Sequence, residues 1–414
     1  MHKKRIVITG IGVVSPIGIG KDQFFSSLFE GKSGFKQISL FDTKDLKVNI
    51  GGQIDNFNPN EILNEERLID LDRATLLLLS AAKLGLDDAK LEINDSNASD
   101  IGTCVGTTFG SLFSISRFNR ESYAEGPRYV NPSIFPSTVG NSPASRISIM
   151  FKVKGFNTTI STGQCAGLDA LDYARDFIEL DKAGTVIAGS VEDLSIQAFL
   201  GLYKLKYLSG SKDNTQIISS PFDKRRNGIV LSEGAATLVL QSLDDAKEGK
   251  NHVYGEILGI GSCFDPSRFY KYNPKGYGMI QAMELALEDA KIEPNSIDCI
   301  FANANSTQEA DSIETMAIKQ AFGDYAYNVP VVAIKSMLGE TFSAGGGLAV
   351  VAALGAIEQG IIPATTNYKE KDNSCDLDYV PNEPRKKELS KVMINAFGPN
   401  GVNTSLIIGK HRQD

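Results

Sequence analysis

The feature that most constrains the fold of this chain is an internal repeat. A segment with helical patterning ends in Gly-Leu-Asp-Asp-Ala-Lys-Leu-Glu at 85–92, and a second one ends in the similar Ala-Leu-Glu-Asp-Ala-Lys-Ile-Glu at 286–293. Each is followed by a short acidic loop and an apolar stretch that predicts a strand, at 101–105 and at 299–302. A repeat of this length favours two similar structural units rather than one irregular domain.

The rest of each half continues in the same order. A strand, a sharp turn and a helix of small residues come first, followed by another strand and by a closing strand. The corresponding segments are 158–171 with 331–353, 185–189 with 392–396, and 235–241 with 404–408. Alternating strands and helices predict sheets that are covered by helices. We therefore predict a duplicated, five-layered α/β fold (αβαβα) with an N-terminal half at 1–250 and a C-terminal half at 251–414.

The stretch 109–146 is the least regular part of the first half. It carries apolar residues among Gly, Pro and Ser, and a long insertion with apolar side chains is usually functional. We expect it to act as a lid, a pocket lining or a subunit contact. The residues that carry this expectation are Phe109, Leu112, Phe113, Ile134 and Phe135.

Histidine is scarce, since the 414 residues include three, at His2, His252 and His411. A mechanism that needs a pair of buried histidines is therefore disfavoured. The five cysteines form neither a CxxC motif nor a Cys/His cluster, so neither a disulfide framework nor a metal site is predicted. A net charge of −8 without a basic tract argues against nucleic acid as a partner. No run is apolar and long enough to span a bilayer, and we expect a soluble cytoplasmic protein without a membrane partner.

The best candidate for a reactive position is the strand–turn–helix elbow at 160–171. A side chain at the tip of such an elbow points outward over the positive end of the following helix, where a nucleophilic Ser or Cys is favoured. Gln164 and Cys165 lie at this turn.

Several motifs, in order along the chain, are similar to those of the β-ketoacyl-acyl carrier protein synthases of the thiolase superfamily. The matching segments lie at 7–16, 126–141, 221–235, 335–339 and 397–403, together with the elbow. The resemblance covers nearly the whole chain and implies a thiolase-like fold. In that family a Cys on the elbow carries the acyl chain, and two His in the second half assist decarboxylation of malonyl carrier protein.

The chain departs from this resemblance at each catalytic position. Gln164 stands at the nucleophile position, Asn305 in place of the first His, and Glu340 in place of the second. The family's Gly-Phe-Gly-Gly gate reads Gly-Pro-Asn-Gly at 398–401. The family positions that are retained include Lys335, Phe397 and Gly398.

Three coordinated losses on an intact scaffold resemble the chain length factor, or ketosynthase β subunit, of bacterial type II polyketide synthases. This resemblance implies a non-condensing subunit that pairs with an active ketosynthase α subunit, as a heterodimer or a dimer of heterodimers. It implies no resident cofactor, because substrates arrive on a phosphopantetheinyl acyl carrier protein. The apolar residues of 109–146 are then either the wall of the tunnel in which an aromatic polyketide elongates, or ordinary core.

Two enzymatic hypotheses stand beside this one. In the first, the chain is a malonyl-acyl carrier protein decarboxylase for priming, in which the Gln164 amide donates to a thioester carbonyl or to a carboxylate. In the second, it is a β-ketoacyl synthase-type acyltransferase that uses Cys165. One step along a helix turns a side chain by about 100°, so packing is the favoured interpretation of Cys165.

The remaining polar positions have structural interpretations as well. Lys335 and Glu340 are expected to neutralise each other in a vestigial pocket, and Asn305 is expected to hold a loop. The basic runs at 224–226 and 385–387 are expected to be solvated faces, with docking of an acidic carrier protein as the alternative.

Overall fold

The computed structural model describes residues 4–65, 68, 71–212, 215–266 and 270–411. The elements of the first half are β1 (Ile6–Ser15), β2 (Gly18–Ile19), α1 (Lys21–Phe29), β3 (Lys36–Gln37), β4 (Ile50–Gly51), α2 (Pro59–Leu63), α3 (Arg73–Asp88), η1 (Ala98–Asp100), β5 (Ile101–Gly106), α4 (Leu112–Glu125), η2 (Pro132–Ser137), α5 (Ser142–Phe151), β6 (Asn157–Ile160), η3 (Gly163–Cys165), α6 (Ala166–Glu179), β7 (Thr185–Glu192), α7 (Ile196–Lys204), β8 (Gly234–Ser242) and α8 (Leu243–Glu248). Those of the second half are β9 (Gly255–Phe264), α9 (Tyr277–Ala290), η4 (Pro294–Ser296), β10 (Cys299–Phe301), α10 (Gln308–Phe322), η5 (Gly323–Tyr327), β11 (Val331–Val332), α11 (Lys335–Leu338), α12 (Ser343–Gln359), β12 (Ile361–Ile362), β13 (Arg385–Lys386), β14 (Lys391–Phe397) and β15 (Val402–Gly409).

The strands of the two halves repeat one topology within an 11-stranded sheet. In the first half β5 pairs in parallel with β6 and β7, and β8 runs antiparallel to β7 and β1. In the second half β10 pairs in parallel with β11 and β14, and β15 runs antiparallel to β14 and β9. The halves join where residues 6–8 of β1 pair with residues 255–257 of β9. The repeat in the sequence is therefore a repeat of topology.

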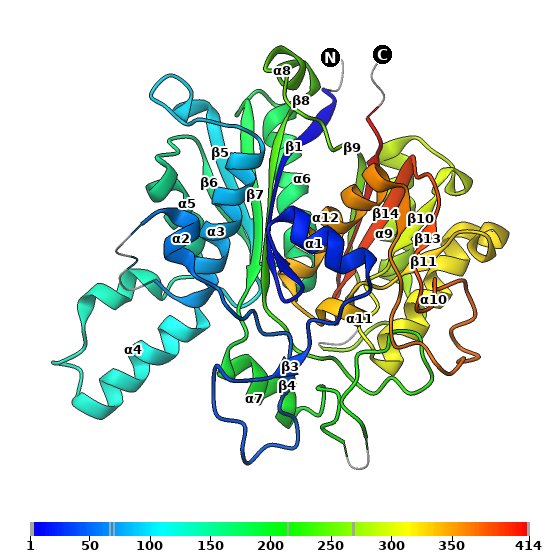
Figure 1. Ribbon diagram of the computed structural model, residues 1–414, viewed down its shortest axis with the longest axis horizontal. Helices are drawn as coiled ribbons and strands as arrows, with labels where there is room; N and C mark the ends of the chain where they lie inside the picture. The colour runs from blue at the N-terminus through cyan, green and yellow to red at the C-terminus, as the bar shows by residue number, and fades with distance from the viewer. Residues whose placement is uncertain (1–3, 66–67, 69–70, 213–214, 267–269, 412–414) are drawn as a thin grey trace.

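Helices lie on the outer faces of the sheet and between its two halves, which gives five αβαβα layers (Figure 1). On the outside, α3 packs against β1, β7 and β8, and α9 packs against β9 and β15. In the middle, α6 packs against β5 and β7, while α12 packs against β8 and β14 and against α6 itself. The predicted five-layered α/β fold is confirmed.

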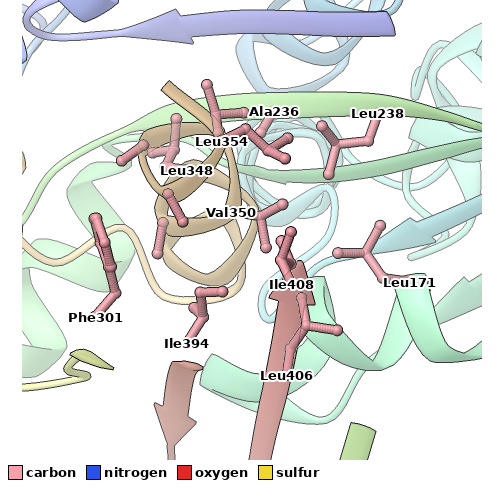
Figure 2. Close-up of a cluster of buried hydrophobic side chains, with 14 of the residues drawn as sticks. Leu171, Ala236, Leu238, Phe301, Leu348, Val350, Leu354, Ile394, Leu406 and Ile408 are labelled. Atoms are coloured by element: carbon pink, nitrogen blue, oxygen red, sulfur yellow. The ribbon is translucent and has the colours of Figure 1, made fainter. Parts of the chain in front are cut away.

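The middle layer is apolar because it is enclosed on every side. α12 consists mainly of Gly, Ala, Val and Leu, and nearly all its residues are buried. Its side chains Leu348, Val350 and Leu354 belong to one core cluster with Leu238 of β8 and Ile394 of β14 (Figure 2). Within the described part of the chain, no helix is long and apolar enough to cross a membrane.

Glycine allows the two central helices to meet backbone to backbone. A Cβ added at Gly167 of α6 would lie 2.3 Å from the carbonyl oxygen of Ser343, at the start of α12. A carbon and an oxygen that are not bonded cannot come so close, so only glycine fits here. This contact holds the N-terminal ends of α6 and α12 side by side.

The insertion at 109–146 is more regular than predicted. It contains the 14-residue helix α4, the 3₁₀ helix η2 and the beginning of α5. The Pro and Gly residues of the segment lie outside α4, so they do not interrupt the helix. The helix α4 projects from the body of the molecule (Figure 1), so most of its side chains reach solvent, whereas Ser114 is buried.

We predict that Gly167→Ala lowers the free energy of unfolding by about 1–3 kcal/mol, because the added methyl group overpacks the contact between α6 and α12. The matched control is Gly201→Ala in α7, where an added Cβ meets nothing within 4 Å. That change is expected to be neutral or to stabilise by up to ~1 kcal/mol through helix propensity. Urea denaturation of both variants checks this, and equal midpoints would contradict the close packing of the central helices.

Candidate functional site

The elbow lies where β6 ends and the 3₁₀ turn η3 leads into α6. Gly163 has a left-handed φ of 71°, and a Cβ there would lie 2.8 Å from Asn400 Nδ2, so the sharp turn requires glycine. Gln164 follows at the tip, 6% exposed. Its amide makes no hydrogen bond to any residue that the structure describes. It is therefore free to bond a bound molecule.

Cys165 points away from the tip and into the core. Its side chain is 0% exposed, and its thiol donates toward the carbonyl oxygens of Ala396 at 3.0 Å and Val402 at 3.2 Å. Burial, together with the nearby Asp169 carboxylate, raises the pKa of the thiol well above its usual value. The nucleophilic thiolate is thus disfavoured, and the packing interpretation of Cys165 agrees with this geometry.

The two positions that correspond to the catalytic histidines form one buried polar cluster. Glu340 is 1% exposed, and its Oε2 accepts from Lys335 Nζ at 3.0 Å and from Asn305 Nδ2 at 3.1 Å. Lys335 Nζ also donates to Asn303 Oδ1 at 3.0 Å. Lys335 and Glu340 neutralise each other, as expected. Neither charge is available as a free acid or base, because separating a buried pair costs several kcal/mol.

Asn305 holds the loop that precedes α10. Its Oδ1 accepts from the Thr307 hydroxyl at 2.8 Å and from the Thr307 N–H at 3.3 Å. The next residue, Ser306, has a left-handed φ of 72°, a conformation that usually favours glycine, and its hydroxyl accepts from Ser220 N–H at 3.0 Å. Below this loop the buried Glu314 accepts from the N–H groups of Asn303 and Ala304, and burial raises its pKa to about 7.

The segment at 398–401 folds over the elbow. Asn400 Nδ2 donates to the Thr162 carbonyl at 3.3 Å, and a Cβ at Gly398 would lie 3.0 Å from Gln164 Oε1. The retained Phe397 is fully buried, and its carbonyl accepts from Asn303 Nδ2 at 3.1 Å and from Tyr272 OH at 3.2 Å. The segment therefore connects the elbow to the buried polar cluster.

A cavity of about 260 Å³ opens beside Gln164. Its apolar wall includes Phe109, Leu112, Leu202 and Phe342. Thr108, Gln197 and Asn400 also line it, and one side-chain oxygen of each is buried without a hydrogen-bond partner among the described residues. An apolar wall with a few unpaired polar groups is typical of a ligand pocket.

The insertion residues do not all reach this cavity. The structure brings Phe109 and Leu112 to Gln164, whereas Ile134 is buried elsewhere in η2. Phe113 and Phe135 are 48% and 59% exposed on the surface of the same segment. Phe113 differs from Leu112 because adjacent helical residues point about 100° apart.

Several lining residues were not predicted from the sequence. Phe342 and the α7 residues Gln197, Leu202 and Leu205 all face the cavity. The position of Phe342, two residues after Glu340, could have indicated that it lies near the site. The α7 residues carried no such signal, because their contribution depends on how the helix lies across the elbow.

The arginines of the two basic runs form ion pairs within the chain. Arg226 is buried and pairs with Asp372 at 2.5 Å, and Arg225 pairs with Asp223 at 2.8 Å. Arg385 pairs with Asp378 at 2.5 Å. Lys224, Arg385 and Lys386 are exposed, as expected for solvated faces, whereas Arg226 is buried, which corrects the solvated-face interpretation for that residue alone.

The remaining predicted features lie apart from the elbow. His252 and His411 line a separate hollow near the junction of the halves, and His2 is outside the described residues. Across the ranges that the structure describes, no group of three or more His, Cys, Asp or Glu side chains is placed to hold a metal ion.

Two family models match the chain. Residues 3–246 match the beta-ketoacyl synthase N-terminal domain, and residues 254–369 match the C-terminal domain. The chain is 35% identical to 3-oxoacyl-[acyl-carrier-protein] synthase 2 of Coxiella burnetii, with 99% of each chain covered. It is 33% identical to the tetracenomycin polyketide synthase ketoacyl synthase alpha subunit of Streptomyces glaucescens, which covers 99% of this chain and 98% of that protein.

Solved structures agree with these relatives. The ishigamide ketosynthase/chain length factor superposes with a TM-score of 0.93 at 31% identity, covering 99% of this chain and 100% of that one. A type II polyketide synthase acyl-carrier protein in complex with its ketosynthase gives a TM-score of 0.89 at 27% identity, with the same coverage. The fold is thereby confirmed as thiolase-like. The chain belongs to the beta-ketoacyl synthase family, because the models of both family domains match it and the relatives align over nearly their whole length.

Proposed function

We propose that this chain is a chain length factor, the non-condensing subunit that pairs with an active ketosynthase in a type II polyketide synthase. The observation that carries the proposal is the state of the catalytic positions. Gln164 occupies the elbow tip, and Glu340 accepts hydrogen bonds from Asn305 and Lys335 rather than being free to act on a substrate.

Condensation needs a nucleophile that can form and release an acyl ester. The amide of Gln164 is a poor nucleophile, so it cannot carry the growing chain as a thioester. The neighbouring thiol of Cys165 is enclosed and protonated, and within the described part of the chain no histidine lies near it to act as a base. These features support a subunit whose partner performs the condensation.

Two surface features of the first half support the proposal that the chain binds a partner chain. The edge strand β6 pairs with β5 on one side, and its other edge has no strand partner among the described residues. In the same half, the α4–η2 segment exposes Phe113, Tyr123 and Phe135. An open strand edge and exposed apolar side chains favour association with another chain. The proposed partner is the ketosynthase α subunit, in a heterodimer or a dimer of heterodimers.

The comparisons with solved structures support the proposed role in a type II polyketide synthase. One similar structure is a ketosynthase/chain length factor, and another is an acyl-carrier protein with its ketosynthase. By analogy, the proposal includes a phosphopantetheinyl acyl carrier protein as the source of substrate, no resident cofactor and a cytoplasmic location. In this setting Phe109 and Leu112, with Phe113, Ile134 and Phe135 of the same segment, are proposed to limit the length of the polyketide.

A second candidate function is decarboxylation of malonyl carrier protein for priming. The observation that favours it is the unpaired amide of Gln164 in the cavity beside the elbow. An amide N–H at a helix N-terminus can stabilise the negative charge that develops on a thioester carbonyl as CO2 leaves.

The first prediction concerns the partner. Expressed alone, the chain is expected to be poorly soluble or to self-associate, whereas coexpression with its ketosynthase yields a stable one-to-one complex on size-exclusion chromatography. Phe135→Asp is expected to weaken this complex, because it puts a charge into the exposed apolar segment. Leu180→Asp, at an exposed leucine of a different element, is the control. The subunit role is contradicted if the chain is a monodisperse monomer that binds no ketosynthase. It is also contradicted if the isolated chain becomes acylated on Cys165.

The second prediction concerns chain length. Phe109→Ala is expected to shift the products of the reconstituted complex toward longer polyketides, because it removes a bulky ring from the cavity wall. Tyr327→Ala, at an exposed aromatic residue of η5 in the second half, is the matched control and should leave the distribution unchanged. Mass spectrometry of the products measures the shift. Product lengths that do not respond to Phe109→Ala would refute the wall.

The third prediction tests the priming activity. If Gln164 assists decarboxylation, Gln164→Ala lowers the rate of CO2 release from malonyl carrier protein on the order of 100-fold, the usual effect of removing a donor to a developing oxyanion. Gln197→Ala removes an amide from another side of the same cavity and serves as the control. Unchanged initiation in the reconstituted complex eliminates the decarboxylase function and leaves the subunit role intact.

A further inference from the structure

A buried carboxyl group at the end of β7 ties two distant segments together. Glu192 accepts from the Thr107 hydroxyl at 2.8 Å, from the Thr108 N–H, and from the Phe109 N–H at 3.3 Å. It also accepts from the Ser343 hydroxyl, at the start of α12, at 2.8 Å. One side chain therefore holds both the loop that carries Phe109 and the first turn of a central helix.

A second carboxyl group acts on the neighbouring residue. Glu340 uses Oε2 for Lys335 and Asn305, and its Oε1 accepts from the Phe342 N–H at 2.9 Å. Phe342 has φ 46° and ψ −118°, a strained conformation for a non-glycine residue. It persists because the hydrogen bonds of Glu340 and Ser343 hold the chain on both sides of it.

The two segments meet in an aromatic pair. The rings of Phe109 and Phe342 lie edge to face with centroids 4.9 Å apart, and both line the cavity beside Gln164. Each ring belongs to a residue whose backbone N–H is bonded to one of the two carboxyl groups. We infer that Glu192 and Glu340 form a carboxylate clamp that positions the Phe109–Phe342 pair and thereby fixes the wall of the cavity.

The clamp gives Glu340 a role of its own at a position where the family resemblance expects a catalytic histidine. Glu340 and Glu192 are positioning residues, because neither faces the elbow tip directly and both act through the two phenylalanines. The inference rests on the proposed function only for its effect on product length. The position of the rings is a property of the isolated chain.

The hydrogen bonds of Glu192 define the informative variants. Thr107, Thr108 and Ser343 donate to Oε1, and the Phe109 N–H is shared between Oε1 at 3.4 Å and Oε2 at 3.3 Å. Burial raises the pKa of this carboxyl to about 7, so the neutral form is readily populated. Gln keeps a carbonyl oxygen at the Oε1 position and should preserve the clamp, whereas Leu has similar volume and no acceptor.

For Glu340, both members of the buried ion pair must be removed together. Glu340→Leu alone would leave the buried Lys335 without its counter-charge, which destabilises the fold. The double change Lys335→Met with Glu340→Leu replaces the pair by apolar groups and withdraws the acceptor of the Phe342 N–H. Ser343→Ala is a milder variant, because it removes one donor to Glu192 and leaves the others in place; it also removes the contact of this hydroxyl with the Val191 carbonyl at 3.0 Å.

The test places 4-fluorophenylalanine at position 109 and records its 19F resonance in the folded chain. We expect Glu192→Gln to reproduce the wild-type resonance, and Glu192→Leu and the double variant to move it, with a smaller displacement for Ser343→Ala. Glu314→Gln is the control, because Glu314 is equally buried and bonds Asn303 and Ala304. If folded Glu192→Leu and Ser343→Ala both keep the wild-type resonance, or if Glu314→Gln moves it equally, the clamp is overturned.

The reconstituted complex separates the clamp from the proposed function. Glu192→Leu is expected to shift the products as Phe109→Ala does, and to add nothing in a chain that already carries Phe109→Ala, because it acts through that ring. An additive effect in the double variant argues for a general structural role and against the clamp. If Phe109→Ala itself leaves product length unchanged while the 19F resonance responds as expected, the proposed wall fails and the clamp stands.

Discussion

The contact between the N-terminal ends of α6 and α12 determines where every other part of the site lies. Gly167 meets the Ser343 carbonyl so closely that no side chain fits between them. Because α6 begins at the elbow and α12 begins just after Phe342, this contact puts the elbow of the first half beside Phe342 of the second. The cavity is therefore a product of the duplication, formed where two equivalent helices begin.

The buried polar cluster explains how a family scaffold persists without the residues that the resemblance assigns to its reaction. A lysine in an apolar interior needs a counter-charge, and Glu340 supplies it while Asn305 and Asn303 take the remaining bonds. The same glutamate holds the strained backbone of Phe342. Glu340 and Asn305, at the positions where the resemblance expects catalytic histidines, thus have structural roles, and Glu340 also holds the cavity wall at Phe342.

Much of the fold could be predicted from the sequence, because strand and helix patterns are local. The segments at 101–105, 185–189, 235–241 and 404–408 all lie within strands of the structure. The insertion was harder to predict, since the Gly, Pro and Ser residues that surround α4 obscured this regular helix near the start of the segment. For the site, motif spacing located Gln164, Glu340 and Asn305, but it could not show that Ile134 turns into the core.

The sequence by itself determined the repeat, the order of elements and the identities of the residues at the elbow and at the two histidine positions. Only the tertiary structure decided which side chains meet. Glu192 and Ser343 are far apart in the chain, as are Phe109 and Phe342, and their contacts depend on how two halves close around the central helices. Periodicity reports which face of an element is buried, whereas the partner across that face is set by packing between elements that no local pattern records.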